Sequence, residues 1–471
     1  MNKTHYLITI LFLLSMANCV NANLENPCDI QSESFLNTIF VKSLIRDSSS
    51  HCGYSLQFNN PTPPTKSLST MMASNHTLLK FEDGRVKAWG DGTLGQLGYN
   101  NNKNIADGAA GNLTIQQSAF LPITETVTQL AEGDVHSCAL LSSGNVRCWG
   151  EGADGRLGYN STDAVGDGVA LSIEAAGNVP IGEKVIQISL GTVHSCALLA
   201  RGAVRCWGRG DFGQLGYNDT QAIGDGFGPS IQTAGDVPLG GTATQISTGD
   251  QHTCALMSNQ AVRCWGGNGS GQLGYNNTTQ IGAGGQTIID SGDIPLGGLA
   301  IQITSGASHS CALLNNGAMR CWGEGADGNL GYNASNNIGD SAPSSIITTG
   351  DVPTGGIVKQ ITAGFFHTCA LYELGNVRCW GDGSSGQLGN NTNTNIGDGF
   401  TPSIIASGDI NLGGKATQIS AGSSHTCALL DTGSVRCWGN GGSGRLGYNS
   451  TSNIANGTGL TILQAGDIIL E

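Results

Sequence analysis

A segment of about 58 residues recurs seven times along this chain, and each copy contains one tryptophan. Successive tryptophans are 57 to 60 residues apart, and the repeats use every tryptophan of the 471-residue sequence. Such regular self-similarity indicates a repeat architecture in which each copy folds into the same unit. A single unit cannot bury its apolar faces alone, so neighbouring units must pack together. The tryptophans are Trp89, Trp149, Trp207, Trp265, Trp322, Trp380 and Trp438.

Composition favours strands and turns over helices. Glycine contributes 73 residues, whereas charged residues make up only 12% of the chain. That balance suits many short strands joined by tight turns, so we expect one large all-β domain. The net charge of −14 argues against nucleic acid as a partner, because nucleic-acid binders carry basic patches.

Each repeat contains the pattern of a β-hairpin. A His-Ser/Thr-Cys-Ala-Leu run leads through a glycine-bearing turn into Val-Arg-Cys-Trp-Gly. If Cys138 faces Cys148, then Leu140 faces Val146, and apolar residues meet across the pair. Opposed positions on antiparallel strands lie about 4.5–5.5 Å apart, which a disulfide can span.

The cysteines therefore predict disulfides. The first repeat loses both positions together, to Leu78 and Ala88, so neither cysteine occurs without its partner. Zinc is the alternative, but zinc needs four convergent ligands and each repeat offers two. We expect a seventh bridge, between Cys28 and Cys52, outside the repeats. The six repeat pairs are Cys138 with Cys148, Cys196 with Cys206, Cys254 with Cys264, Cys311 with Cys321, Cys369 with Cys379, and Cys427 with Cys437.

The N-terminal region predicts export. Residues 1–22 carry Lys3, an apolar stretch and then small residues, as in a cleaved secretory signal; a lipoprotein signal at Cys19 is the alternative. We expect residues 23–66 to form a cap and linker, and residues 67–471 to form the repeat domain. Secretion, the periplasm or the cell surface is the expected location, in agreement with the disulfides.

The ends of the chain suggest how the domain closes. The sequence stops in the middle of a repeat, while residues 69–72 occupy the position of the Gln-Ile run that precedes each hairpin. We expect the seven units to pack radially, with the N-terminal strand completing the last unit and removing an open edge. The Gly-Asp-Val/Ile-Pro run, as in residues 235–238, is expected to open an outer strand.

The other recurring polar residues suggest structural roles. Seven histidines, one per repeat, would be spread around a ring instead of gathering as metal ligands. The aspartate of Gly-Asp-Val/Ile-Pro could hold calcium, but we expect it to pair with the arginine before the second cysteine, which has the same period. No set of residues suited to catalysis emerges, and we expect no cofactor and no metal. The histidines are His76, His136, His194, His252, His309, His367 and His425.

The recurring blocks resemble a known family. Gly-x-x-His-Ser/Thr-x-Ala-Leu, Gly-x-Val-x-x-Trp-Gly and Gly-Gln-Leu-Gly form the signature of the regulator-of-chromosome-condensation repeat, and the match covers residues 68–471. This resemblance implies a seven-bladed β-propeller. The family namesake is a nuclear exchange factor for a small GTPase, but the longer repeats and the cysteines are more similar to an exported branch of the family.

A fold shared by unrelated activities does not decide the function. We expect a non-enzymatic, monomeric scaffold that presents the loops of one propeller face to a protein or glycan. The alternatives are a guanine-nucleotide exchange factor and an extracellular enzyme or enzyme inhibitor. Binding positions are expected where the repeats disagree. The candidates are Tyr372, Glu373, residues 209–212 and residues 109–117.

Overall fold

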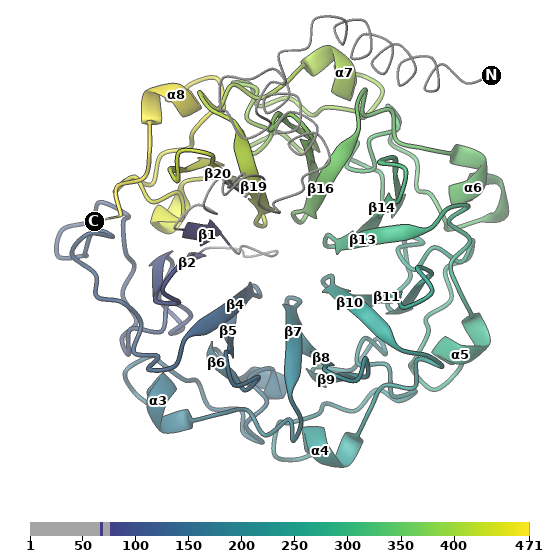
Figure 1. The fold of residues 1–471 in the computed structure, drawn as a ribbon, viewed down its shortest axis with the longest axis horizontal. Helices are drawn as coiled ribbons and strands as arrows, with labels where there is room; N and C mark the ends of the chain where they lie inside the picture. Colours follow the sequence, from purple (N-terminus) through teal and green to yellow (C-terminus); the bar gives the residue numbers. More distant parts are fainter. Residues whose placement is uncertain (1–65, 69–75, 471) are drawn as a thin grey trace, which may run out of the picture. The chain divides into compact units, whose positions relative to one another are not determined.

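The computed structural model describes residues 66–68 and 76–470, which form seven antiparallel sheets of three strands each. Figure 1 shows the sheets arranged radially as blades, with the first strand of each blade nearest the common axis. The predicted all-β, seven-bladed propeller is confirmed. The blades are β1 (Lys66–Leu68), β2 (His76–Phe81), β3 (Val86–Gly90); β4 (Val127–Glu132), β5 (His136–Leu141), β6 (Val146–Gly150); β7 (Val185–Leu190), β8 (His194–Leu199), β9 (Val204–Gly208); β10 (Ala243–Thr248), β11 (His252–Met257), β12 (Val262–Gly266); β13 (Ala300–Ser305), β14 (His309–Leu314), β15 (Met319–Gly323); β16 (Val358–Ala363), β17 (His367–Tyr372), β18 (Val377–Gly381); and β19 (Ala416–Ala421), β20 (His425–Leu430), β21 (Val435–Gly439).

Short helices lie at the outer edge of the blades (Figure 1). Each α-helix is a single turn whose start is fixed by a serine or threonine, as when the Ser172 hydroxyl accepts a hydrogen bond from the Ala175 amide at 3.2 Å. The first helical residue, such as Ile173, is buried and anchors the turn. The helices are α3 (Ile173–Ala176), α4 (Ile231–Ala234), α5 (Ile288–Ser291), α6 (Ile346–Thr349), α7 (Ile404–Ser407) and α8 (Ile462–Ala465), with 3-10 turns η1 (Ala153–Gly155), η2 (Ala342–Ser344) and η3 (Gly442–Gly444).

The second and third strands of each blade pair in the predicted register. Cys138 faces Cys148 and Leu140 faces Val146, and the other cysteine-containing blades repeat this pattern. In blades 2 to 7 the second strand is buried along its whole length, because both of its faces lie against neighbouring blades.

All six predicted pairs of cysteines within the hairpins are bonded as disulfides. In each of them the two α-carbons lie 4.0 to 4.1 Å apart, so the paired strands bring the side chains within bonding reach. The bonds join Cys138 to Cys148, Cys196 to Cys206, Cys254 to Cys264, Cys311 to Cys321, Cys369 to Cys379, and Cys427 to Cys437.

The first strand of blades 2 to 7 contains a β-bulge, and in blades 2 to 6 a glutamine beside the bulge connects the strand to the next blade. Val127 faces Leu141 and Gln129 faces Leu140, so Thr128 is the extra residue. The Gln129 side chain then pairs with the neighbouring first strand like a piece of backbone: it donates to the Ile188 carbonyl at 3.0 Å and accepts from the Ile188 amide at 2.9 Å. The same two-bond contact joins Gln187 to Ile246, Gln245 to Ile303, Gln302 to Ile361 and Gln360 to Ile419.

The prediction that the Gly-Asp-Val/Ile-Pro run opens a regular outer strand is wrong. In the described residues, the Gly-Asp-Val/Ile-Pro segment makes one ladder-type bond, from the Val237 amide to the Val204 carbonyl at 2.8 Å. The Leu239 amide then bonds the Val237 carbonyl at 2.8 Å, which folds the chain into a γ-turn around Pro238. The same turn forms around Asn411 in blade 6, where the Leu412 amide bonds the Ile410 carbonyl at 3.0 Å, so pairing stops after one bond with or without proline.

The strand that closes the ring also differs from the prediction. β1 pairs with β2, placing Leu68 opposite Leu79, so the N-terminal strand belongs to the first blade and the last sheet contains only β19, β20 and β21. The last blade fills its own outer position, because the Ile468 amide bonds the Val435 carbonyl at 2.9 Å.

Several predicted features lie outside the described residues. The position before the first hairpin that was expected for residues 69–72 is taken by β1, because Leu68 faces Leu79 as Leu130 faces Ala139, and residues 69–72 themselves are among the residues outside the described ranges. So are residues 1–65, with the expected signal, the cap and the bridge between Cys28 and Cys52. These features stay predictions.

Within the described ranges, no helix has both the length and the apolar character needed to cross a membrane.

Candidate functional site

The seven histidines join neighbouring blades through buried hydrogen bonds. Each stands at the start of a second strand, and Nε2 of His136 lies 3.0 Å from the Ser195 hydroxyl of the next blade. The last of these pairs closes the ring, since Nε2 of His425 lies 3.1 Å from the Thr77 hydroxyl of blade 1. The other pairs are His76–Ser137, His194–Thr253, His252–Ser310, His309–Thr368 and His367–Thr426.

The hydroxyl between two blades determines which histidine nitrogen carries the proton. The Ser195 hydroxyl donates to the Arg156 carbonyl at 2.9 Å, and the Trp207 indole donates to the same oxygen at 3.0 Å. The hydroxyl must therefore accept from the Nε2–H of His136. The other nitrogen, Nδ1, has no partner, and a Cβ at Gly133 would lie only 2.6 Å from it. The carbonyls that accept from a tryptophan in this way belong to Gln96, Arg156, Gln214, Gln272, Asn329, Gln387 and Arg445.

This environment keeps the histidines neutral. Burial lowers the pKa of His194, His252 and His309 to about 3, because a second proton on Nδ1 would find no acceptor. Each imidazole forms its hydrogen bond between a different pair of blades. Among the described residues, no group of three or more His, Cys, Asp or Glu side chains is placed to hold a metal ion.

The predicted pairing of arginine with aspartate is confirmed at the outer edge of five blades. Nε of Arg263 lies 2.6 Å from an oxygen of Asp293. In blade 2 the acceptor is Asn178, whose amide oxygen lies 3.2 Å from Nε of Arg147. The aspartates considered for calcium therefore bind guanidinium groups. The remaining ion pairs are Arg205–Asp236, Arg320–Asp351, Arg378–Asp409 and Arg436–Asp467.

The binding candidates predicted from disagreements between repeats do not form one site. The Tyr372 hydroxyl is buried and donates to the Thr354 carbonyl at 2.8 Å, while Glu373 is exposed in the adjoining hairpin turn of blade 6. Residues 209–212 belong to blade 3, where Arg209 forms an ion pair with Asp211 at 2.6 Å. Residues 109–117 form a largely exposed loop of blade 1.

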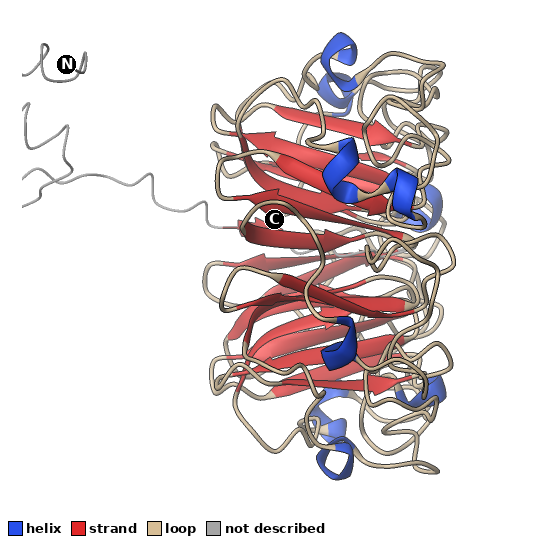
Figure 2. Ribbon diagram, turned by 90° about the vertical axis from the view of Figure 1, so that its right-hand side faces the viewer, coloured by secondary structure: helices blue, strands red, loops and turns tan. Residues whose placement is uncertain are grey.

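A different surface gathers the loops of all seven blades. Because His136 faces Gly150, the connection before the second strand and the segment after the third strand leave from the same end of the blade. The longer loops lie at this end and the hairpin turns at the other (Figure 2). We call it the long-loop face. Its residues are 91–115, 151–172, 209–230, 267–287, 324–345, 382–403 and 440–461, with the connections 133–135, 191–193, 249–251, 306–308, 364–366 and 422–424.

The long-loop face carries the whole excess of negative charge in the described chain. It contains sixteen Asp and Glu residues against four Lys and Arg, whereas the rest of the described residues contain fourteen of each. The crowding affects ionisation. Burial, with the nearby carboxylate of Asp134, raises the pKa of Asp250, and burial, with Asp382, raises that of Asp327. Such a surface attracts cations and basic partners.

Two phenylalanines project from this acidic face at equivalent loop positions. Phe227 is 91% exposed and Phe400 is 90% exposed. Each tip is held by an aspartate two residues earlier: Asp225 accepts from the Phe227 amide at 3.0 Å, and Asp398 accepts from the Phe400 amide at 2.9 Å. These bonds hold the backbone at each loop tip, and the rings extend from it into solvent. Aromatic residues exposed in this manner are typical of protein interfaces.

A second aromatic feature of this face was missed from the sequence. Phe365 and Phe366 lie in the connection between β16 and β17, where the other blades have no aromatic residue in the described connections, and their rings meet edge to face with centroids 6.2 Å apart. Comparing this three-residue connection between repeats would have revealed them.

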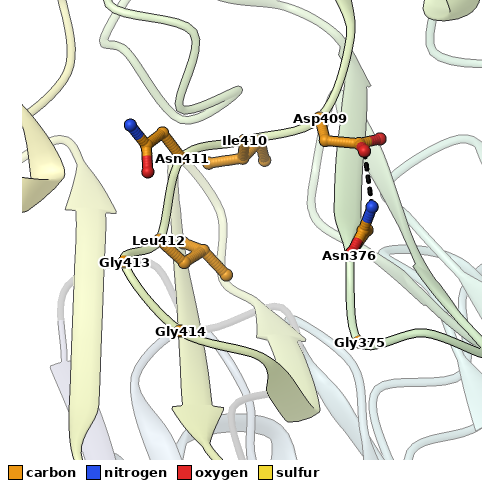
Figure 3. A pocket seen from close by; sticks show the side chains of 8 residues that line it. All are labelled: Gly375, Asn376, Asp409, Ile410, Asn411, Leu412, Gly413 and Gly414. Atoms are coloured by element: carbon orange, nitrogen blue, oxygen red, sulfur yellow. Dashed lines mark hydrogen bonds between the residues drawn. The ribbon is translucent and has the colours of Figure 1, made fainter.

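The outer edge of blade 6 is hollowed. A pocket of about 430 Å³ is lined by Gly375, Asn376 and the segment 409–414 (Figure 3). On one side of the pocket the Asn376 amide donates to the Asp409 carboxylate at 2.6 Å, and Asp409 also binds Arg378 at 2.6 Å. This pocket adjoins a smaller cavity that shares Asp409, Ile410 and Asn411.

Comparison with known proteins agrees with this architecture. The ultraviolet-B receptor UVR8 of Arabidopsis thaliana is 28% identical over 393 residues, which are 83% of this chain and 80% of that protein. The human E3 ubiquitin-protein ligase HERC2 is 29% identical over 349 residues, 74% of this chain but only 6% of that protein. The crystal structure of Kap60 bound to yeast RCC1 (Prp20) superposes with a TM-score of 0.57 at 19% identity, covering 86% of this chain and 88% of that chain.

Matches to the individual repeats identify the family. One model of the regulator of chromosome condensation (RCC1) repeat matches residues 127–156, 185–214, 243–272, 300–329, 358–387 and 416–445, and a second matches 201–256 and 375–429. These matches contain the histidines and tryptophans that join blades 2 to 7. The chain belongs to the RCC1-repeat family of β-propellers.

Proposed function

We propose that this protein is an exported, non-enzymatic scaffold whose long-loop face binds a basic protein. The observation that carries the proposal is the separation of charge: sixteen acidic against four basic residues on this face, and equal numbers elsewhere in the described chain. Complementary charge accelerates the encounter with a partner, and aromatic residues such as Phe227 and Phe400 supply contact area once it is bound.

Other observations support parts of this proposal. A propeller relative from yeast was crystallised with a protein partner, Kap60, and the family includes proteins with unrelated activities. The six disulfides fit an oxidising compartment outside the cytosol.

The experiment is affinity capture of proteins from the exported fraction with the intact, oxidised chain, followed by measurement of binding to the purified partner. We expect a basic partner whose affinity falls steeply with salt and falls further in a Phe227→Ser/Phe400→Ser variant. The control is Leu374→Ser, which removes an apolar side chain, 74% exposed, from a hairpin turn at the other end of blade 6. An affinity that does not depend on salt concentration, or a loss of binding only in the control variant, would contradict the proposal. Accelerated nucleotide release from a panel of small GTPases would favour an exchange factor instead.

A further inference from the structure

In six blades, a tyrosine fills the space between the third strand and the outer segment. In blade 5 the Tyr332 hydroxyl accepts from the Cys321 amide at 3.1 Å and lies 3.2 Å from the Gly350 carbonyl, to which it can donate. Tyr159, Tyr217, Tyr275 and Tyr448 contact a cysteine amide and a glycine carbonyl in the same manner, and Tyr99 contacts the Ala88 amide in blade 1.

Blade 6 has Asn390 at this position, and the shorter side chain leaves the space open. A cavity of about 140 Å³ lies between Cys379, the segment 388–391, Ile396 and the segment 407–411. The proline that forms the γ-turn in earlier blades is Asn411 here. The cavity therefore occurs in the one blade whose sequence departs from the repeat on both sides of the cavity, at Asn390 and at Asn411.

Its polar groups lack the partner that the other blades provide. Cys379 and Gly408, which correspond to Cys321 and Gly350, both line the cavity. No side chain in the described part of the chain takes the place of the missing hydroxyl at the Cys379 amide. The side-chain oxygen of Asn390 is also buried without a hydrogen-bond partner. Buried polar groups left in this state favour a ligand that can hydrogen-bond to them.

We propose that this cavity, the Asn390 cavity, binds a phenol: the tyrosine side chain of a partner or a free para-substituted phenol. Its polar groups lie where the other blades bind a phenolic hydroxyl. Its volume suits one ring, because apolar cavities of roughly 150 Å³ accommodate benzene. The larger pocket of Figure 3 shares Asp409, Ile410 and Asn411 with it and gives room for whatever the ring is attached to.

The test is calorimetric titration of the intact, oxidised protein with p-cresol. We expect saturable binding of one molecule per chain, and toluene should bind at least about tenfold more weakly because it leaves the polar groups unpaired. Asn390→Tyr should abolish binding and raise the melting temperature, since the chain then supplies its own ring. The reciprocal variant, Tyr332→Asn, should create a second site and double the stoichiometry.

The outcomes separate the alternatives. Failure of p-cresol to saturate the wild type, equal affinity for toluene, or unchanged binding in Asn390→Tyr would each overturn the proposal, and the wild-type titration decides it even if Tyr332→Asn fails to fold. Titration with N-acetyltyrosinamide distinguishes the two sources. Binding as tight as that of p-cresol supports a tyrosine from a protein partner, whereas binding of p-cresol alone supports a free phenol. The cavity borders the long-loop face, because the segment 388–391 and Ile396 belong to both, but phenol binding needs neither the negative charge of that face nor Phe227 and Phe400, so either proposal can fail without the other.

Discussion

Glu132 is the one carboxylate that the described blades place fully inside the protein. It stands at the end of β4, where the other bulged first strands end in leucine, threonine, serine or alanine. One oxygen accepts from the Leu78 amide of blade 1 at 2.5 Å, and the other has no partner. Burial raises the pKa of Glu132 well above its ordinary value of 4.5, although the hydrogen bond from Leu78 opposes this.

Replacing this carboxyl by an amide, in Glu132→Gln, should stabilise the protein at about pH 8 and have little effect near about pH 4. The unfolded chain releases the proton near 4.5 and the folded chain holds it to higher pH, so the folded state is penalised as pH rises above that value. The amide keeps an acceptor for Leu78 and removes the charge. Thermal unfolding at both pH values checks this, with exposed Glu373→Gln as the control. Equal shifts at both pH values would show that the charge is not responsible.

Residues that follow the repeat could be predicted, and residues that depart from it were harder to interpret. The cysteine pairs and the Arg–Asp ion pairs share one period, so the sequence alone brings them together. Glu132 and Asn390 are visible as departures in the same alignment. The role of Glu132 depends on which way its side chain points after the bulge. The role of Asn390 depends on which neighbour fills the gap beside it. The spacing of the repeats predicts neither.

At the scale of the hairpin, blade 1 shows what a blade looks like without its disulfide. Leu78 faces Ala88 there in the same register that Cys254 and Cys264 adopt in blade 4. We expect Cys254→Leu with Cys264→Ala to fold normally and to lose about 2–3 kcal/mol of stability, the loop-closure contribution of such a bridge. Denaturant unfolding measures the loss, and reduction of the wild type provides the comparison. A double variant as stable as the oxidised wild type would show that the bridge contributes nothing.

The ion pair at the outer edge should contribute far less than the disulfide. Asn178 replaces the aspartate in blade 2 and still accepts a hydrogen bond from Arg147, which indicates that geometry matters more than charge there. Asp293→Asn in blade 4 is therefore expected to cost under about 1 kcal/mol, because the pair is partly exposed. The matched variant Asn178→Asp should gain a similar amount. A loss of several kcal/mol in Asp293→Asn would mean that the charge itself is essential.

For the whole molecule, the number of blades was predictable and the closure was not. The period gives seven units, but a chain that stops within a repeat is compatible with either end completing a blade. The structure pairs β1 with the hairpin that follows it in sequence, because joining consecutive segments costs less chain entropy than joining distant ones. The acidic long-loop face could not be predicted from the sequence either. Its charged residues are scattered along the chain and come together only because the fold places those loops at one end of the propeller.

The ring of seven histidines predicts how acid unfolds the molecule. In the folded chain, burial holds the pKa of His76, His194, His252 and His309 at about 3, holds that of His367 at about 4, and lowers those of His136 and His425 well below the ordinary 6.5. The unfolded chain binds protons below 6.5 and the folded chain does not, so stability present above that pH is lost as pH falls towards 3. Each histidine contributes about 1.4 kcal/mol per pH unit within this window. Glu132, Asp250 and Asp327, whose pKa values are raised by burial, act in the opposite direction, but they are three groups against seven. The melting temperature should therefore fall steeply between about pH 6 and pH 4, and less steeply in His194→Gln, which keeps a donor for Thr253 and cannot be protonated. A melting temperature that stays constant over this range would mean that the imidazoles are not held neutral between the blades.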